Sequence, residues 1–247
     1  MHPLSVPELL TVWEHGFAAL PYERALTILS VASPETSPSA LARLSIGRRD
    51  ASLLQLREWA FGKELAILTA CPSCHETLEL TMPVAALRVA EDSTENSAVD
   101  FENSFELRDY KVRYRSLNTE DVASCAGLEP AARRRKLLAC CVTDAHSNGQ
   151  VVPAEKLPED VAQKVAEQIA AMDPQADMRI ELSCPACAES WKEVFDIVSF
   201  FWTEIDAWAR RTLQEVNVLA RAYGWSERDI LALSPMRRQI YLSIAQA

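Results

Sequence analysis

Two short stretches decide the fold of this chain: "ACPSCHE" at residues 70–76 and "SCPACAE" at residues 183–189. Alone, the first stretch is ambiguous, because a Cys-x-x-Cys pair followed by histidine fits zinc binding, dithiol redox chemistry or covalent haem attachment. The second stretch repeats the cysteine pair without the histidine. Two such pairs supply four thiolates, which complete the closed tetrahedral shell of a structural zinc site. The sequence therefore predicts one structural Zn²⁺ per chain, with these ligands: Cys71, Cys74, Cys184 and Cys187.

The residues around each pair favour strands. Both "ELAILTACPSCHETLELTMP" (64–83) and "MRIELSCPACAESWKEVFDI" (178–197) predict a strand, a turn and a second strand, as in the hairpins of a zinc ribbon. Thioredoxin-like motifs instead place one pair at a strand-to-helix step, which disfavours redox chemistry. Haem attachment is disfavoured because Ala188, not histidine, follows the second pair. His75 is expected to be a bystander on the strand surface, and an unmetallated hairpin pair stays as an alternative.

The other cysteines have no partner at a matching spacing. Cys125, Cys140 and Cys141 are therefore interpreted as small buried apolar residues, since a free cysteine packs like a hydrophobic side chain.

The composition favours helices, because alanine and leucine are abundant and only six glycines occur. The expected fold class is α+β and mostly helical: a split zinc-ribbon-like pair of β-hairpins, an inserted helical segment and a C-terminal helical hairpin. The cost of closing a loop rises slowly with its length, so a long insertion between the knuckles is acceptable. The expected order is N-terminal helices at 1–62, the first zinc-knuckle hairpin at 63–90, an acidic linker at 91–106, an inserted α/β segment at 107–176, the second hairpin at 177–197 and C-terminal helices at 198–247.

The charge balance argues against a nucleic-acid binder. The net charge is −10, and phosphate contacts need clustered lysines and arginines. The longest basic run, residues 133–136, is interpreted as the solvated face of a helix. The N-terminus lacks the basic lead of a signal peptide, and no stretch of about 18 uncharged apolar residues occurs. A cytoplasmic protein without a membrane span is expected.

No catalytic motif is present in the sequence. It contains no Gly-x-Ser-x-Gly, no P-loop and no His-Glu-x-x-His, and none of its four histidines has a setting that suggests acid–base work. A non-enzymatic protein without a small-molecule substrate is therefore expected.

The C-terminal sequence carries a family resemblance. "LARAYGWSERDILALSPMRRQIYL" (219–242), with the upstream "SFFWTEIDAWARRTLQEVNVLA" (199–220), resembles the T-even-phage-type baseplate hub assembly chaperone family of tailed phages and contractile injection systems. "GRRDASLLQLREWAFG" (47–62) before a Cys-Pro-x-Cys hairpin is also similar to that family. The strongest similarity covers residues 45–80 and 180–245. It implies binding to baseplate, hub or spike proteins in the bacterial cell or infected host, as a transient chaperone or as a subunit retained in the particle.

The C-terminal run could serve that binding. Aromatic anchors beside arginines suit a partner surface. The candidate partner-binding residues are Trp225, Ile230, Leu231, Arg237, Arg238 and Tyr241. The alternative is that this helical hairpin only closes the core of its domain.

Two other functions stay open from sequence. One is a zinc-ribbon adaptor in transcription or nucleic-acid handling, although bases near the knuckles are sparse: Lys63, Arg179 and Lys192. The other is a dithiol oxidoreductase, which would leave the protein metal-free with a reactive Cys71 or Cys184.

Overall fold

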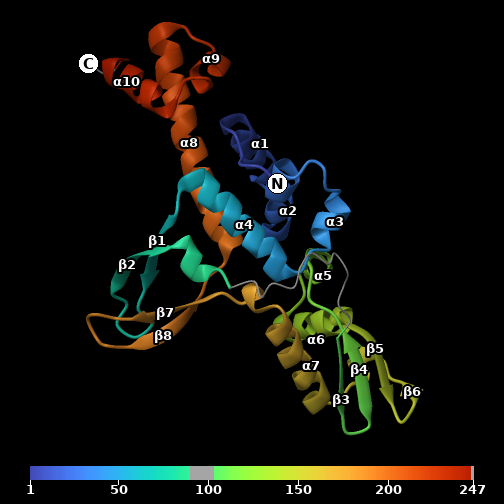
Figure 1. Cartoon of the computed structure of the whole chain (residues 1–247). Helices are drawn as coiled ribbons and strands as arrows, with labels where there is room; N and C mark the ends of the chain where they lie inside the picture. The colour runs from blue at the N-terminus through green and yellow to red at the C-terminus, as the bar shows by residue number, and fades with distance from the viewer. Residues whose placement is uncertain (90–102, 246–247) are drawn as a thin grey trace. The chain divides into compact units, whose positions relative to one another are not determined.

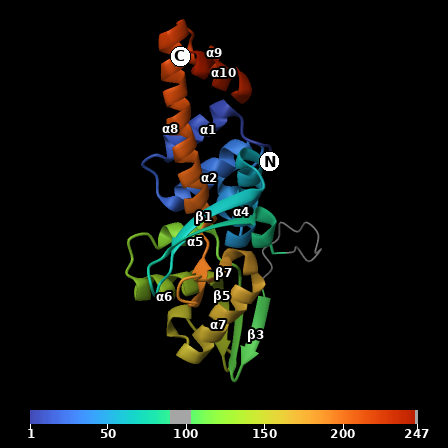
Figure 2. The same cartoon turned by 90° about the vertical axis from the view of Figure 1, so that its left-hand side faces the viewer.

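The computed structural model describes residues 1–89 and 103–245 (Figures 1 and 2). The chain divides into two compact units, Met1–Pro34 with Ile197–Ala247 and Glu35–Asp196. Helices dominate both described ranges, and their sheets are small and antiparallel, so the expected α+β, mostly helical class is confirmed. The predicted acidic linker lies outside the described residues as far as residue 102, and its end, 103–106, belongs to a strand.

The first unit is helical. Its long helix is α8 (Ile197–Tyr223), which packs against α1 (Val6–Gly16) and α2 (Pro21–Ala32) and continues to α9 (Glu227–Leu231) and α10 (Pro235–Ala245). The sequence dictates the start of α1: the Ser5 backbone N–H donates to Glu8 Oε2 at 2.8 Å in a capping box. The Ser5 hydroxyl and backbone N–H, with His2, lower the pKa of Glu8 to about 2.

A tryptophan fills the contact between α1 and α8. A Cβ added to Gly16 would lie 2.3 Å from the Trp202 ring, so only glycine fits there. The guanidinium of Arg24 covers that ring at 4.3 Å from its centroid and donates to the Gly16 carbonyl. Nearby, Trp13 Nε1 donates to Asp206 Oδ1 at 2.8 Å. These contacts fix the register of the helices in this unit.

The C-terminal helices form a small core of their own. Val216, Leu219, Ile230 and Leu242 are buried together. Gly224, at φ 68°, ends α8, because a residue with positive φ stops a helix. Ser226 caps α9: its Oγ accepts from the Asp229 N–H at 3.2 Å and its hydroxyl donates to Asp229 Oδ2 at 2.6 Å.

The second unit contains the hairpins and the inserted segment. Its helices are α3 (Pro38–Ala42), α4 (Ile46–Phe61), α5 (Thr119–Ser124), α6 (Pro130–Cys141) and α7 (Glu159–Met172), with short 3-10 turns η1 (Val84–Leu87), η2 (Ala154–Lys156) and η3 (Pro174–Ala176). Strands β1 (Glu64–Ala70) and β2 (Thr77–Pro83) form one hairpin, and β7 (Arg179–Ser183) and β8 (Ser190–Val194) form the other.

Between the hairpins lies a four-stranded antiparallel sheet in the order β3-β4-β5-β6. Its strands are β3 (Asn103–Leu107), β4 (Tyr110–Tyr114), β5 (Val142–Ser147) and β6 (Gln150–Val151). Helix α7 packs its predicted apolar stripe against this sheet: Val161, Val165 and Ile169 are buried with Val112, Tyr114, Cys141 and Ala145.

The two hairpins start next to each other, because α4 precedes the first hairpin, η3 precedes the second, and α4 and η3 are in contact. Helix α4 leads directly into β1, and η3 leads to β7. The Gly47 N–H donates to Asp173 Oδ2 at 2.9 Å. The buried Gln175 side chain donates to the Leu87 carbonyl at 3.0 Å and accepts from the Val89 N–H at 2.7 Å. These bonds join the end of the first hairpin to the start of the second.

Candidate metal centre

The four cysteines predicted as ligands come together. The Sγ atoms of Cys71 and Cys187 are 3.6 Å apart, and those of Cys74 and Cys184 are 3.5 Å apart. All four sulfurs lie within 4.8 Å of one another. Metal–sulfur bonds of about 2.3 Å in a tetrahedron place the sulfurs about 3.8 Å apart. The four side chains therefore fit one metal ion.

Two of the close sulfur contacts, Cys71 with Cys187 and Cys74 with Cys184, join the two hairpins. A disulfide needs sulfurs about 2.0 Å apart, and all seven cysteines are free thiols. An ion bound here would link segments that are separated by the whole inserted sheet and its helices. Its effect would be that of a staple across a long loop.

The two knuckles have the same backbone geometry. In the first, the His75 N–H donates to the Cys71 carbonyl at 3.0 Å, and in the second the Ala188 N–H donates to the Cys184 carbonyl at 2.9 Å. His75 and Ala188 have φ values of 61° and 60°, the left-handed conformation that glycine adopts most easily. His75 therefore occupies a turn position, and the four-ligand group does not include it.

The neighbouring thiols perturb each other's ionisation. Backbone hydrogen bonding from Cys74 lowers the pKa of the Cys71 thiol to about 7. A backbone hydrogen bond from Glu76 lowers the pKa of Cys74, but the thiols of Cys187 and Cys184 outweigh it and raise that pKa to about 12. Four thiolates this close repel one another in the absence of a cation. Metal binding would remove the protons and neutralise the repulsion.

Apart from Cys71 and Cys184, the buried apolar side chains of the hairpins lie near their base. Leu65 is fully buried, and Met178, Ile180 and Phe195 are buried at the start and end of the second hairpin. Farther along the strands, partly buried side chains such as Ile67 and Leu80 alternate with exposed ones such as Leu68, which is 73% exposed. Isolated two-stranded hairpins are marginal in water, so the cysteine cluster supplies the contact that the tips otherwise lack.

The bases near the second hairpin are engaged in ion pairs. Arg179 contacts Asp177 at 2.9 Å, and Lys192 contacts Glu181 across the strands at 2.9 Å. The second hairpin therefore carries little unpaired positive charge for a nucleic-acid backbone.

The remaining cysteines lie apart from the cluster. Cys125 and Cys141 are buried, as the sequence predicts, whereas Cys140 is half-buried. Burial raises the pKa of the Cys141 thiol to about 12, so it stays protonated.

The predicted partner-binding residues gather in the C-terminal core. Trp225 stacks on Tyr223 at 4.6 Å between centroids and meets the edge of Tyr241 at 4.9 Å. Ile230 is fully buried, and Arg238 is buried in an ion pair with Glu215 at 2.8 Å. Leu231 is half-buried, and Arg237 is exposed. Ile230 and Arg238 are therefore too buried to contact a partner directly and can only hold exposed neighbours in place. The partner-binding role of the six residues stays a prediction.

The exposed apolar residues of α10 were missed in the sequence. Met236, Ile240 and Ile244 are 76%, 49% and 58% exposed, and their i, i+4, i+8 spacing places them on one face. The signal was visible, because α10 buries Leu242 on another face and so carries two apolar faces. Within the described ranges, no helix is both long and apolar enough to span a membrane.

Comparison with known proteins gives one result. A protein-family model described as "T4 bacteriophage base plate protein" matches residues 19–202, a range that includes both hairpins and all four clustered cysteines. Neither the curated proteins nor the solved structures include a significant match.

Proposed function

Because the chain belongs to the T4 bacteriophage base plate protein family through residues 19–202, we propose that it is a non-enzymatic assembly chaperone or baseplate component of a contractile phage tail or injection system. It acts by binding baseplate, hub or spike proteins in the cytoplasm of the bacterial cell or infected host. It is then released or retained in the particle.

The observation that carries this proposal is the exposed stripe of α10, formed by Met236, Ile240 and Ile244. Its opposite face already packs on the end of α8 through Leu242, so the stripe has no role in that core. An apolar helix face at i, i+4, i+8 spacing is the usual form of a helix that docks against a partner. Arg237 is exposed beside the stripe and offers a charged contact at its edge.

The proposed role of the cysteine cluster is structural. Four thiolates in a closed shell favour Zn²⁺ and leave no position for a reacting water or substrate. The bound ion would hold the hairpins together and would stabilise the unit that contains them. Cys71, Cys74, Cys184 and Cys187 are its proposed ligands.

The geometry supports the alternative functions less well. A dithiol oxidoreductase needs the two cysteines of one motif to react with each other at an accessible site, whereas here each of these sulfurs also contacts a sulfur of the other hairpin and Cys71 is fully buried. A nucleic-acid adaptor needs unpaired bases on the hairpins, but Arg179 and Lys192 are paired with acids.

The test is co-purification with the other baseplate and hub proteins of the same tail, co-expressed with the full chain. The variant Ile240→Asp places a charge in the middle of the α10 stripe and is expected to reduce recovery of the partner at least tenfold. Val151→Asp is the matched control, because Val151 is also an exposed apolar residue, at 73%, but lies at the end of β6.

The possible outcomes distinguish partner binding through the α10 stripe from the proposed assembly role. Loss of the partner with Ile240→Asp and retention with Val151→Asp supports both. Equal retention with the two variants shows that α10 is the wrong face. Failure of the unmodified chain to retain any baseplate or hub protein overturns the assembly role itself.

A further inference from the structure

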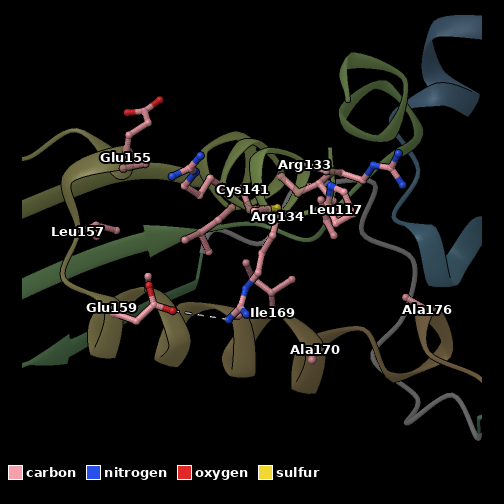
Figure 3. Close-up of a pocket in the computed structure, with 18 of the residues that line it drawn as sticks. Leu117, Arg133, Arg134, Cys141, Glu155, Leu157, Glu159, Ile169, Ala170 and Ala176 are labelled. Atoms are coloured by element: carbon pink, nitrogen blue, oxygen red, sulfur yellow. Dashed lines mark ion pairs between the residues drawn. The ribbon is translucent and has the colours of Figure 1, made fainter. Parts of the chain in front are cut away.

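A groove of about 720 Å³ runs between α6 and α7 in the inserted segment (Figure 3). Its volume lies within the roughly 300–1,000 Å³ that is typical of binding clefts. Leucine, isoleucine and alanine side chains line much of it, including Leu117, Leu157 and Ile169. Leu117 and Leu157 are only partly covered at the edge of the sheet core, whereas Ile169 is buried in that core.

The α7 wall of the groove is shaped for another helix. Val161 and Val165 face the sheet core. A different face of α7 lines the groove with the small residues Ala162, Ala166 and Ala170. Small side chains at i, i+4, i+8 allow a second backbone to approach closely. From Glu159 to Ala170 this wall is about 16 Å long at 1.5 Å per residue, which accommodates about three helical turns.

The α6 wall is basic. Arg133, Arg134 and Arg135 all line the groove and are exposed. Arg133 donates to the Leu128 carbonyl, and neither Arg133 nor Arg135 has an ion pair among residues 1–89 and 103–245. In a chain of net charge −10, two unpaired arginines beside an apolar groove favour an acidic ligand.

The acids of the groove are largely engaged already. The Asp173 carboxylate accepts from the Gly47 N–H at 2.9 Å, and Asp177 pairs with Arg179 at 2.9 Å. Glu159 lies 4.0 Å from Arg134, which reaches from α6 to α7 (Figure 3). Among the lining acids, Glu155 alone has neither an ion pair nor a side-chain hydrogen bond in the described part of the chain.

Arg134 also bridges the two walls by donating to Gln163 Oε1 at 2.7 Å. Its pair with Glu159 joins side chains that are 66% and 89% exposed. Such exposed pairs contribute at most about 1 kcal/mol, so an incoming carboxylate can replace Glu159 as the partner of Arg134 at little cost.

We propose that this groove binds an acidic amphipathic helix of another baseplate or hub protein, which becomes the third helix of a layer with α6 and α7. The apolar face of that helix would lie along the alanines of α7, and its carboxylates would face Arg133 and Arg135. The class of partner rests on the proposed function, whereas the site is separate from the α10 stripe.

The test is site-specific photo-cross-linking of the full chain, co-expressed with the baseplate and hub proteins of the same tail. A benzoylphenylalanine replaces Ala170, which lines the groove and is exposed, so the replacement leaves the core intact. Leu137, on the α6 wall, is the second position. Lys164, on an exposed face of α7 outside the groove, is the control position.

The expected adducts from Ala170 and Leu137 contain one acidic helical segment of a baseplate or hub protein, and Lys164 gives none. The double variant Arg133→Glu, Arg135→Glu should reduce the Ala170 adduct at least tenfold. Adducts with a second copy, with nucleic acid or with a segment lacking acids overturn the proposal, as does the absence of an adduct from both groove positions. If co-purification through α10 persists without a groove adduct, the groove inference fails and the proposed function stands.

Discussion

Two small antiparallel regions of the second unit are stabilised in opposite ways. The sheet β3-β4-β5-β6 rests on an apolar core, in which Val112, Val161 and Val165 are fully buried. Apart from Cys71 and Cys184, the hairpins β1-β2 and β7-β8 bury side chains near their base, while their tips meet through four sulfurs. A hydrophobic core draws on many weak contacts. A metal ion held by these four sulfurs would concentrate the stabilisation of the tips in four side chains, so its loss should be abrupt and local.

The largest expected effect is therefore removal of a ligand. Cys184→Ser, or treatment with a strong chelator, should reduce bound zinc from one per chain to less than a tenth and unfold both hairpin tips. Structural zinc contributes about 10–16 kcal/mol in small zinc-finger peptides. Metal analysis with hydrogen exchange would show rapid exchange in β1, β2, β7 and β8 and unchanged protection in β4 and β5.

Cys140→Ser is the control for this experiment, because Cys140 is half-buried and lies outside the cluster. It should keep the metal. Equal loss of protection in hairpins and sheet after chelation would contradict the comparison, since it would show that the metal holds the whole unit together.

The same contrast explains what the sequence could predict. The two hairpins could be predicted from the cysteine pairs, because each pair is a short motif whose two residues have a fixed spacing. The motif occurs twice in the chain. Helix ends were also predictable from local signals, such as the caps at Ser226 and Ser234. The pairing of β4 with β5 depends on contacts between residues that α5 and α6 separate in the sequence, and periodicity in the sequence specifies such contacts only weakly.

One strand pair could have been predicted and was missed. Asn148-Gly149 joins β5 to β6, and both residues have positive φ values, 49° and 78°. Asn-Gly is the strongest short-range signal for a hairpin turn. The groove between α6 and α7 could not be predicted, because it depends on how two helices lie on the sheet. The basic run at 133–136 pointed only to an exposed helix face.

The second expected effect concerns the base of the hairpins and tests whether it is independent of the metal. Burial raises the pKa of Asp50 to about 6, although Arg49 beside it acts in the opposite direction. The folded state thus holds this proton more tightly than the unfolded state. The contribution of Asp50 to stability is most favourable below about pH 4 and is lost as the pH rises through 6.

Two pKa units correspond to about 3 kcal/mol. Asp50→Asn should therefore gain stability relative to the unmodified chain by up to about that amount between pH 4 and pH 7, in denaturant titrations at each pH. Thiolate–metal binding has the opposite pH dependence, because it strengthens as the pH rises. A constant difference between the two proteins across this range would show that Asp50 does not titrate as proposed.

The third expected effect lies in the sheet core. Val165→Ala removes two methyl groups from a fully buried position on α7 and should lower the free energy of unfolding by about 2 kcal/mol. The loss should be the same in metal-loaded and chelated protein, because distant sites are additive. Unfolding followed by circular dichroism under both conditions measures it. A loss that changes by more than about 1 kcal/mol on chelation would mean that core and cluster are coupled.

The smallest expected effect is in the knuckle turns and tests the role of His75. His75 and Ala188 both hold left-handed backbone at φ about 60°. Glycine adopts this conformation without the cost of roughly 1 kcal/mol that other residues incur. His75→Gly and Ala188→Gly should therefore each favour the folded, metal-bound hairpin by up to about that amount and tighten zinc affinity a few-fold in a chelator competition.

Arg108→Gly makes the matching change at φ 54° in the turn between β3 and β4, but it also removes an exposed ion pair with Asp160. It should leave zinc affinity unchanged, since that turn belongs to the sheet. Zinc affinity that falls tenfold or more in His75→Gly, but rises in Ala188→Gly, would identify the His75 imidazole as a metal ligand. The two knuckles would then differ in chemistry despite their shared backbone geometry.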